Sequence, residues 1–155
     1  MTAPLSIRID DLTGEPTRKL LALHLAGMAA NTPPEHVRAL DLSGLQKPQI
    51  TVWTAWRAQD IAGIGALNVF APGHGELKSF RTHPGHLRQG VAASLLDHII
   101  GEARGRGLSR LSLETGRGEA FEAALALYRS RGFTDGEAFS DYDASDFNQF
   151  LHLDL

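Results

Sequence analysis

One segment of the chain joins a β-prone stretch to a strongly periodic helical stretch, and its residue types suit an anionic ligand. Gly90, Ala92 and Ala93 are small, so a ligand can approach the backbone closely. Arg88 can add a positive charge, and Ser94 can add a hydroxyl one turn into the helix. The first four N–H groups of a helix lack internal partners, and with the helix dipole they attract phosphate oxygens. The segment is therefore a candidate phosphate site.

Two well-known phosphate signatures are missing from this loop. It does not have the G-x-G-x-x-G spacing of dinucleotide-binding loops, and no G-K-[ST] follows its glycine. A glycine ahead of a helix is common in proteins that bind nothing there. On the loop alone, a turn without a ligand is an equal alternative.

Hydrophobic periodicity and chain breakers predict the elements that hold this loop. Helices are expected at residues 15–30, 35–40, 90–106 and 119–131, with Thr13 as the N-cap of the first. Strands are expected at residues 6–9, 50–57, 61–70, 76–82, 108–114, from 133 onward and at 148–154.

The connection lengths predict how these strands pair. The second, third and fourth strands are joined too closely for crossovers, so they should form an antiparallel meander. The fourth and fifth strands are joined through the long helix, so they should be parallel with a right-handed crossover. The expected fold is one α+β domain over residues 1–155. It is a three-layer sandwich with a mixed, mostly antiparallel sheet and helices on both faces.

Composition narrows the classes of function. The chain has 155 residues, with 15 basic and 18 acidic side chains, and so lacks the basic excess of a nucleic-acid binder. It has no cysteine, which excludes disulfides, thiolate–zinc sites and a cysteine nucleophile. The first ten residues do not resemble a signal peptide, and no apolar run is long enough for a membrane span. These features favour a cytoplasmic protein that does not bind membranes.

Two further groups of polar residues have plain explanations. His83 and His86 have no thiolate or carboxylate close by in sequence, so we expect surface histidines and no metal site. Asp141, Asp143 and Asp146 indicate a solvated acidic loop, although attraction of a cationic acceptor is the alternative.

Three motifs, taken with the element order, resemble the GNAT superfamily of N-acetyltransferases. Residues 87–92 are similar to its signature [QR]-x-x-G-x-[GA], although Leu87 replaces the usual Arg or Gln and Arg88 follows it. Residues 126–133 resemble the ending A-x-x-L-Y-x-x-x-G-F. Residues 76–82, 113–116 and 139–142 are similar to a bacterial subgroup typified by YsnE, whose substrates are poorly defined.

The resemblance implies acetyl-CoA as acyl donor on a GNAT-like fold. In the family, loop amides hold the pyrophosphate of coenzyme A, and the preceding strand pairs its backbone with the pantetheine arm. The residues that would do so here are Phe80, Arg81 and Thr82 on the strand, and Arg88, Gln89, Gly90, Val91, Ala92, Ala93 and Ser94 in the loop and helix.

The resemblance also implies catalytic roles. Tyr128 would protonate the departing thiolate, and a backbone N–H near Phe80 or Arg81 would stabilise the oxyanion. Glu76 stands 14 residues before Gly90, as the base glutamate does in histone-acetylating members, and would act as general base.

Each catalytic assignment has an alternative. Glu76 could instead be a solvent-facing strand residue paired with Lys78, and Tyr128 could be only an aromatic anchor between helix and sheet. Glu114 and His74 are weaker candidates for the base.

The predicted function is therefore acetyl transfer to a primary amine of a small molecule, directly within a ternary complex. Two alternatives stay open, namely a non-catalytic acyl-CoA-binding or sensing module and a generic nucleotide-phosphate binder. Many members of the family dimerise, which implies a homodimer.

Overall fold

The computed structural model describes residues 3–155, so Met1 and Thr2 of the expected domain and N-terminal segment lie outside the described residues. The strands are β1 (Leu5–Ile9), β2 (Ile50–Arg57), β3 (Asp60–Ala71), β4 (His74–Thr82), β5 (Arg110–Thr115), β6 (Thr134–Asp135) and β7 (Gln149–Asp154). The helices are α1 (Glu15–Asn31), α2 (Leu42–Leu45), α3 (Val91–Gly105) and α4 (Glu119–Ser130), with 3-10 turns η1 (Pro34–His36) and η2 (Pro84–His86). Within this part of the chain, no helix is both long and apolar enough to cross a bilayer.

The strands form one seven-stranded sheet in the order β1-β2-β3-β4-β5-β7-β6. All neighbouring pairs are antiparallel except β4 and β5, which run parallel on either side of the α3 crossover. The predicted α+β class, the β2–β3–β4 meander and the parallel β4–β5 pair are therefore confirmed.

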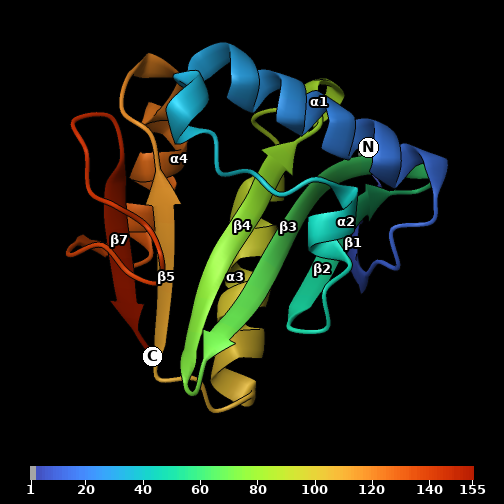
Figure 1. Ribbon diagram of the computed structural model, residues 1–155. Helices are drawn as coiled ribbons and strands as arrows, with labels where there is room; N and C mark the ends of the chain where they lie inside the picture. The colour runs from blue at the N-terminus through green and yellow to red at the C-terminus, as the bar shows by residue number, and fades with distance from the viewer. Residues whose placement is uncertain (1–2) are drawn as a thin grey trace.

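Helices cover both faces of the sheet because the strands alternate apolar residues on each side (Figure 1). Toward α1 lie Leu20 and Leu21 of the helix, packed with Val52, Ile64 and Ala66. Toward α3 and α4 lies the larger core, which contains Trp53, Ala55, Leu67, Leu77, Leu95, Leu96, Ile99, Leu111, Leu125 and Leu151. The two helical layers fix the strands that carry the candidate site.

The parallel pair β4–β5 is short compared with its strands. Only three residue pairs are in register, ending at Glu76 opposite Ser112, although β4 continues to Thr82 and β5 to Thr115. Beyond Glu76 the two strands diverge, as the green and orange arrows of Figure 1 show. Because β3 pairs with the opposite edge of β4 as far as Thr82, the edge of β4 that faces β5 has no partner strand beyond Glu76 within the described residues.

Two local predictions are wrong. Gly14, and not Thr13, is the N-cap of α1, because the Thr13 hydroxyl donates instead to Asp11 at 2.7 Å. The helix expected at residues 35–40 is instead the 3-10 turn η1, and the short helix α2 begins only at Leu42. Asp41 caps that short helix by accepting the N–H of Gly44 at 2.9 Å, and so fixes where it begins.

Candidate active site

The loop before α3 has a run of free backbone donors. Within the described residues, no N–H from Leu87 to Ala93 donates a hydrogen bond to a protein atom; the first helical bond of α3 runs from Ser94 N to Gly90 O at 3.0 Å. Arg88 and Gly90 both have positive φ, 60° and 78°. Alternation of left-handed and other residues turns successive N–H groups toward one side, which makes an anion-binding nest. The run therefore has the chemistry that phosphate oxygens need.

The side chains of this loop leave the donors accessible. Leu87, Arg88, Gln89 and Gly90 are exposed, and a Cβ added at Gly90 would meet nothing within 4 Å. Ser94 is also exposed. Arg88 thus supplies an exposed positive charge beside the free amides, which complements the helix dipole.

The predicted pantetheine strand carries a β-bulge beside the open edge of β4. Two residues, Ser79 and Phe80, stand opposite the single Gly65, and Ser79 has a φ of 58°. The Phe80 ring fills the space over Gly65, where a Cβ would lie 2.9 Å from it. A bulge redirects backbone groups out of the ladder, here at the edge that no strand covers.

Glu76 lies where β4 and β5 separate, and it is buried, with 3% of its surface exposed. One carboxylate oxygen accepts from Asn68 Nδ2 at 3.2 Å. The other accepts from Lys78 Nζ at 3.3 Å and from the Tyr142 hydroxyl at 2.5 Å. The pairing with Lys78 is as predicted, but the solvent-facing alternative for Glu76 is wrong because the segment around Tyr142 covers it.

Tyr142 is held in place by aromatic rings and cations. Its ring centroid lies 5.2 Å from that of Phe139 and 6.0 Å from that of Phe150, and these three residues form a small buried cluster. The Arg38 guanidinium stacks 4.5 Å from the ring centroid and pairs with Asp141 at 2.9 Å. The predicted solvated acidic loop therefore has a buried tyrosine at its centre.

Glu114 provides a second carboxylate near this cluster. It is half-buried on β5, two residues beyond Ser112 and on the same face. Burial raises the pKa of the Glu114 carboxyl above its usual value, and a neighbouring Glu76 charge acts in the same direction, while Lys78 and Arg38 oppose it. A carboxylate with a raised pKa is a stronger proton acceptor than an ordinary one.

Tyr128 comes from the opposite face of the sheet. It is buried on α4, and its ring centroid lies 6.5 Å from that of Phe80 and 5.9 Å from that of Phe133. Burial raises the pKa of the Tyr128 hydroxyl to about 12, so the hydroxyl keeps its proton at neutral pH. Burial is the one cause of this shift, and no hydrogen bond from a described residue contributes, which leaves the hydroxyl available as a donor.

His74, a weaker candidate for the base, is engaged elsewhere. Its Nε2 lies 2.6 Å from Ser112 Oγ, which lies 2.6 Å from His152 Nδ1, and His152 Nε2 donates to the carbonyl of Glu137 at 2.8 Å. Burial lowers the pKa of the His74 imidazole. The chain of contacts makes His74 part of a link between β4, β5 and β7.

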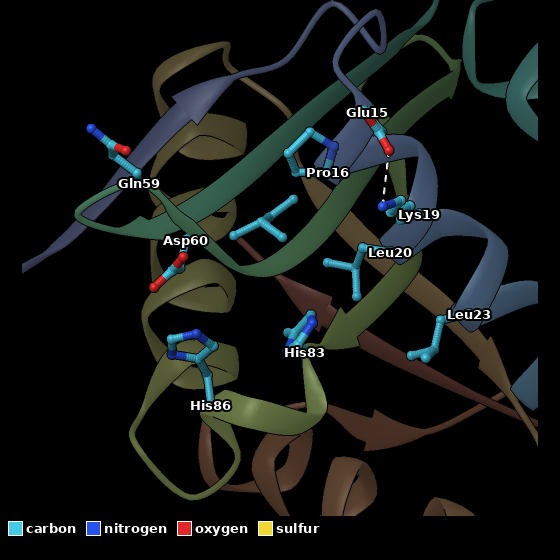
Figure 2. A pocket seen from close by; sticks show the side chains of 10 residues that line it. Glu15, Pro16, Lys19, Leu20, Leu23, Gln59, Asp60, His83 and His86 are labelled. Atoms are coloured by element: carbon cyan, nitrogen blue, oxygen red, sulfur yellow. Dashed lines mark ion pairs between the residues drawn. The ribbon is translucent and has the colours of Figure 1, made fainter.

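A separate hollow of about 650 Å³ lies between the first half of α1, the β2–β3 turn and the segment around η2 (Figure 2). His83 Nδ1 on its floor accepts the N–H of Gly85 at 3.0 Å. The hollow is lined by Glu15, Pro16, Lys19, Leu20, Leu23, Gln59, Asp60, Ile61, His83 and His86. Neither Glu76 nor Tyr128 is among these residues, so this space is not the one where the candidate catalytic groups meet. The described residues include no group of three or more acidic or histidine side chains placed to hold a metal ion.

The comparisons with known proteins agree with this geometry. Residues 18–133 match the Acetyltransferase (GNAT) family. The chain is 48% identical over 145 residues to the uncharacterized N-acetyltransferase YsnE of Bacillus subtilis, covering 94% of this chain and 96% of YsnE. It is 46% identical over 150 residues to the uncharacterized N-acetyltransferase YedL of Escherichia coli, covering 97% of this chain and 94% of YedL.

Solved structures share the fold. A Klebsiella pneumoniae protein assigned as an acyl-CoA N-acyltransferase superposes with a TM-score of 0.82 at 28% identity, covering 97% of each chain. An Elizabethkingia anophelis GNAT acetyltransferase with acetyl-CoA bound superposes with a TM-score of 0.72 at 16% identity, covering 97% of this chain and 98% of that chain. Free loop amides, a sheet opened beside a bulged strand and close relatives over nearly the whole length lead to one conclusion: this chain belongs to the GNAT family of acetyltransferases.

Proposed function

We propose that this protein transfers an acetyl group from acetyl-CoA to a primary amine of a small molecule, directly within a ternary complex. The observation that carries the proposal is the run of free amides from Leu87 to Ala93, placed next to the uncovered edge of β4. A pyrophosphate needs the first feature and a pantetheine arm needs the second. A nucleotide triphosphate would use only the loop.

On the donor side, backbone groups do the binding. The pyrophosphate of coenzyme A accepts hydrogen bonds from the amides of residues 88–93, with Arg88 and the Ser94 hydroxyl beside them. The pantetheine amides pair with β4 at Phe80, Arg81 and Thr82, as an added strand would. This pairing brings the thioester carbon to the bulge at Ser79.

On the acceptor side, a carboxylate must take a proton. An alkylamine has a pKa of about 10.4, so only about one molecule in a thousand is nucleophilic at neutral pH. Glu76 is the first candidate and acts directly or through one water, with Lys78 and Tyr142 fixing its orientation. Glu114 is the second candidate, because burial raises its pKa and it shares the face of Glu76.

The transfer itself conserves electrons and protons without any further reactant. The amine nitrogen attacks the thioester carbon, and the oxyanion is stabilised by a backbone N–H at Phe80 or Arg81. The attacking nitrogen gives its proton to the base, Glu76 or Glu114. The intermediate then collapses as the C–S bond breaks, and the thiolate takes a proton from Tyr128. The proton held by the base then returns Tyr128 to its neutral form through solvent. The chain has no cysteine for a covalent acyl-enzyme, which supports direct transfer.

Release of free thiol from acetyl-CoA, measured with a panel of primary amines, tests the proposal. We expect release to depend on both the enzyme and the amine, and an N-acetylated product to appear in equal amount by mass spectrometry. A protein that binds acetyl-CoA but acetylates no amine would instead be a non-catalytic acyl-CoA sensor. If ATP displaced coenzyme A at equal concentration, the site would be a generic phosphate binder.

A further inference from the structure

Arg81 is a half-buried cation that lies between β4 and α1. Its Nε donates to Nδ1 of His24 at 3.1 Å, and its Nη2 lies 3.5 Å from the His24 carbonyl oxygen. The guanidinium lies against bare helix backbone at Gly27, where an added Cβ would be 2.8 Å from Nη2. The absence of a side chain at Gly27 is therefore what admits the guanidinium.

His24 does not balance the charge of Arg81. His24 is buried, and burial, with the Arg81 charge adding to it, lowers the pKa of its imidazole to about 4. Because Nδ1 accepts a hydrogen bond, the single ring proton of the neutral imidazole is on Nε2. The contact is thus between a cation and a neutral ring.

No carboxylate balances this charge either. Within residues 3–155, no acidic side chain lies within ion-pair distance of Arg81, whereas Lys78 is paired with Glu76 and Arg38 with Asp141. Burial accordingly lowers the pKa of the Arg81 guanidinium, with no acid opposing it. A partly desolvated cation is stabilised by a counter-ion, and Nη1 makes no hydrogen bond to a described residue.

The position of Arg81 relates this charge to the acetyl transfer. Arg81 is paired with Ile64, Lys78 with Ala66 and Glu76 with Asn68. Directly opposed residues of an antiparallel pair share a face, and Ile64 and Ala66 both pack toward α1. Arg81 therefore lies on the same face as the candidate bases, one residue beyond Phe80 along the uncovered edge of β4.

We propose that Arg81 binds a carboxylate of the acceptor, so that the substrates are amines with a carboxylate a few bonds from the nitrogen, such as amino acids. The inference rests on the proposed function and narrows its substrate class. The carboxylate forms a charge-assisted hydrogen bond with the free side of the guanidinium. The amine then lies between Arg81 and the carboxylates of Glu76 and Glu114, beside the thioester carbon.

Matched acceptors test the proposal. For leucine, phenylalanine and alanine, we would compare the free acid, its primary amide and the amine that lacks the carboxyl group. We expect kcat/KM for the acids to exceed that for the amides and the decarboxylated amines at least tenfold, mainly through KM. Equal values, or a preference for the uncharged carboxyl derivatives, would overturn the proposal while leaving acetyl transfer to amines intact.

Variants identify the residue responsible. Arg81→Gln should reduce the acid-to-amide ratio of kcat/KM to within about twofold of one, and Arg81→Lys, which keeps the charge, should give an intermediate ratio. Arg110→Gln removes an exposed arginine that pairs with Asp154 at the far end of β5 and should keep the wild-type ratio. Circular dichroism checks that each variant folds. A wild-type ratio in Arg81→Gln would contradict the assignment.

A binding measurement separates the two proposals if no amine is acetylated. N-acetylleucine and its amide, the products that the reaction would give, would be titrated into the protein saturated with coenzyme A. Binding of the acid that weakens at least tenfold in Arg81→Gln would support the carboxylate site even though the transfer had failed. Equal binding of acid and amide, or binding of neither, would overturn it.

Discussion

The Tyr142 hydroxyl donates a hydrogen bond to the Glu76 carboxylate at 2.5 Å, although 66 positions separate the two residues in the chain. Lys78 donates to the same carboxylate and to the same hydroxyl, at 3.3 and 2.8 Å. The segment between β6 and β7 therefore completes the candidate base on β4. Until the last part of the chain has folded, Glu76 lacks its shortest hydrogen bond and its cover.

Replacing Lys78 with methionine should destabilise the protein strongly. The pair of Lys78 and Glu76 is almost completely buried, with side-chain exposures of 10% and 4%. Removing one partner leaves a buried charge without its counter-ion, which typically costs about 3–5 kcal/mol. Urea unfolding would measure the loss. Arg110→Met breaks an exposed pair and should change stability by less than about 1 kcal/mol; a similarly small loss in Lys78→Met would contradict the prediction.

Replacing Ala93 with aspartate should separate helix stability from donor binding. Ala93 is in the first turn of α3, which has no acidic residue. A carboxylate there favours the helix by about 0.3–1 kcal/mol, but it occupies the amides and repels phosphate. We expect an unchanged or higher melting temperature together with at least tenfold weaker binding of coenzyme A by calorimetry. Gly101→Asp, on an exposed later turn of α3, is the control and should bind normally.

Tyr128→Phe should lower kcat and leave donor affinity intact. A general acid typically contributes about 10²–10⁴-fold to the rate, and the raised pKa of Tyr128 keeps its proton available up to about pH 12. Phenylalanine preserves the ring contacts with Phe80 and Phe133. Steady-state kinetics and calorimetry would give the two values. Unchanged turnover would reduce Tyr128 to a packing residue.

The pH profile should distinguish Glu76 from Glu114 as the base. A base works only when deprotonated, so activity falls as the pH drops through its pKa, and burial moves that limb upward for Glu114. With one acceptor used throughout, the titration of the amine is common to all variants. If Glu114 is the base, Glu114→Gln removes the acid limb and lowers the rate about 10²-fold or more. If Glu76 is the base, Glu76→Gln does so instead, and an unchanged rate across pH in either variant excludes that residue.

His24 should make the protein less stable in mild acid. Its pKa is about 4 when folded against an ordinary value of 6.5, so between these values the unfolded chain binds a proton that the folded protein does not. Stability therefore falls as the pH drops from about 6.5 to about 4, by about 3 kcal/mol in total. Urea midpoints across this range would show the slope. His24→Gln should reduce it, whereas His98→Gln, at an exposed position, should not.

The sequence predicted the features of the fold and of the candidate site that depend on local backbone chemistry. Small residues ahead of a periodic helix predict a candidate phosphate loop, and the structure adds the free amides and the positive φ of Arg88 and Gly90. Short connections likewise indicated the meander, and the long helix indicated the parallel strand. These features depend on residue types and connection lengths within a short segment, and not on which distant residues the fold brings next to it.

The contacts around Glu76 could not be read from the sequence. The pairing with Lys78 was part of the alternative in which Glu76 faces solvent, because both residues lie on one face of a strand. Tyr142 is distant in the chain and stands among aspartates that suggest an exposed loop. Its burial follows from Phe139 and Phe150, which are brought together only by the fold. The one sequence signal for this burial was the presence of aromatic residues on both sides of the acidic stretch 141–146. The charge of Arg81 was equally hidden, because a missing carboxylate is visible only once the neighbours are known.

The short pairing between β4 and β5, called the seam below, makes the stability of the sheet depend on whether the acyl donor is bound. Three residue pairs join the two parts of the sheet there, and a pantetheine arm that pairs with β4 would lengthen the seam. Hydrogen–deuterium exchange of amides near Phe80 and Leu113 should therefore slow when acetyl-CoA is added. Resistance to proteolysis would then rise and fall with the concentration of acetyl-CoA, so in the cell the protein would be protected only while acetyl-CoA is abundant.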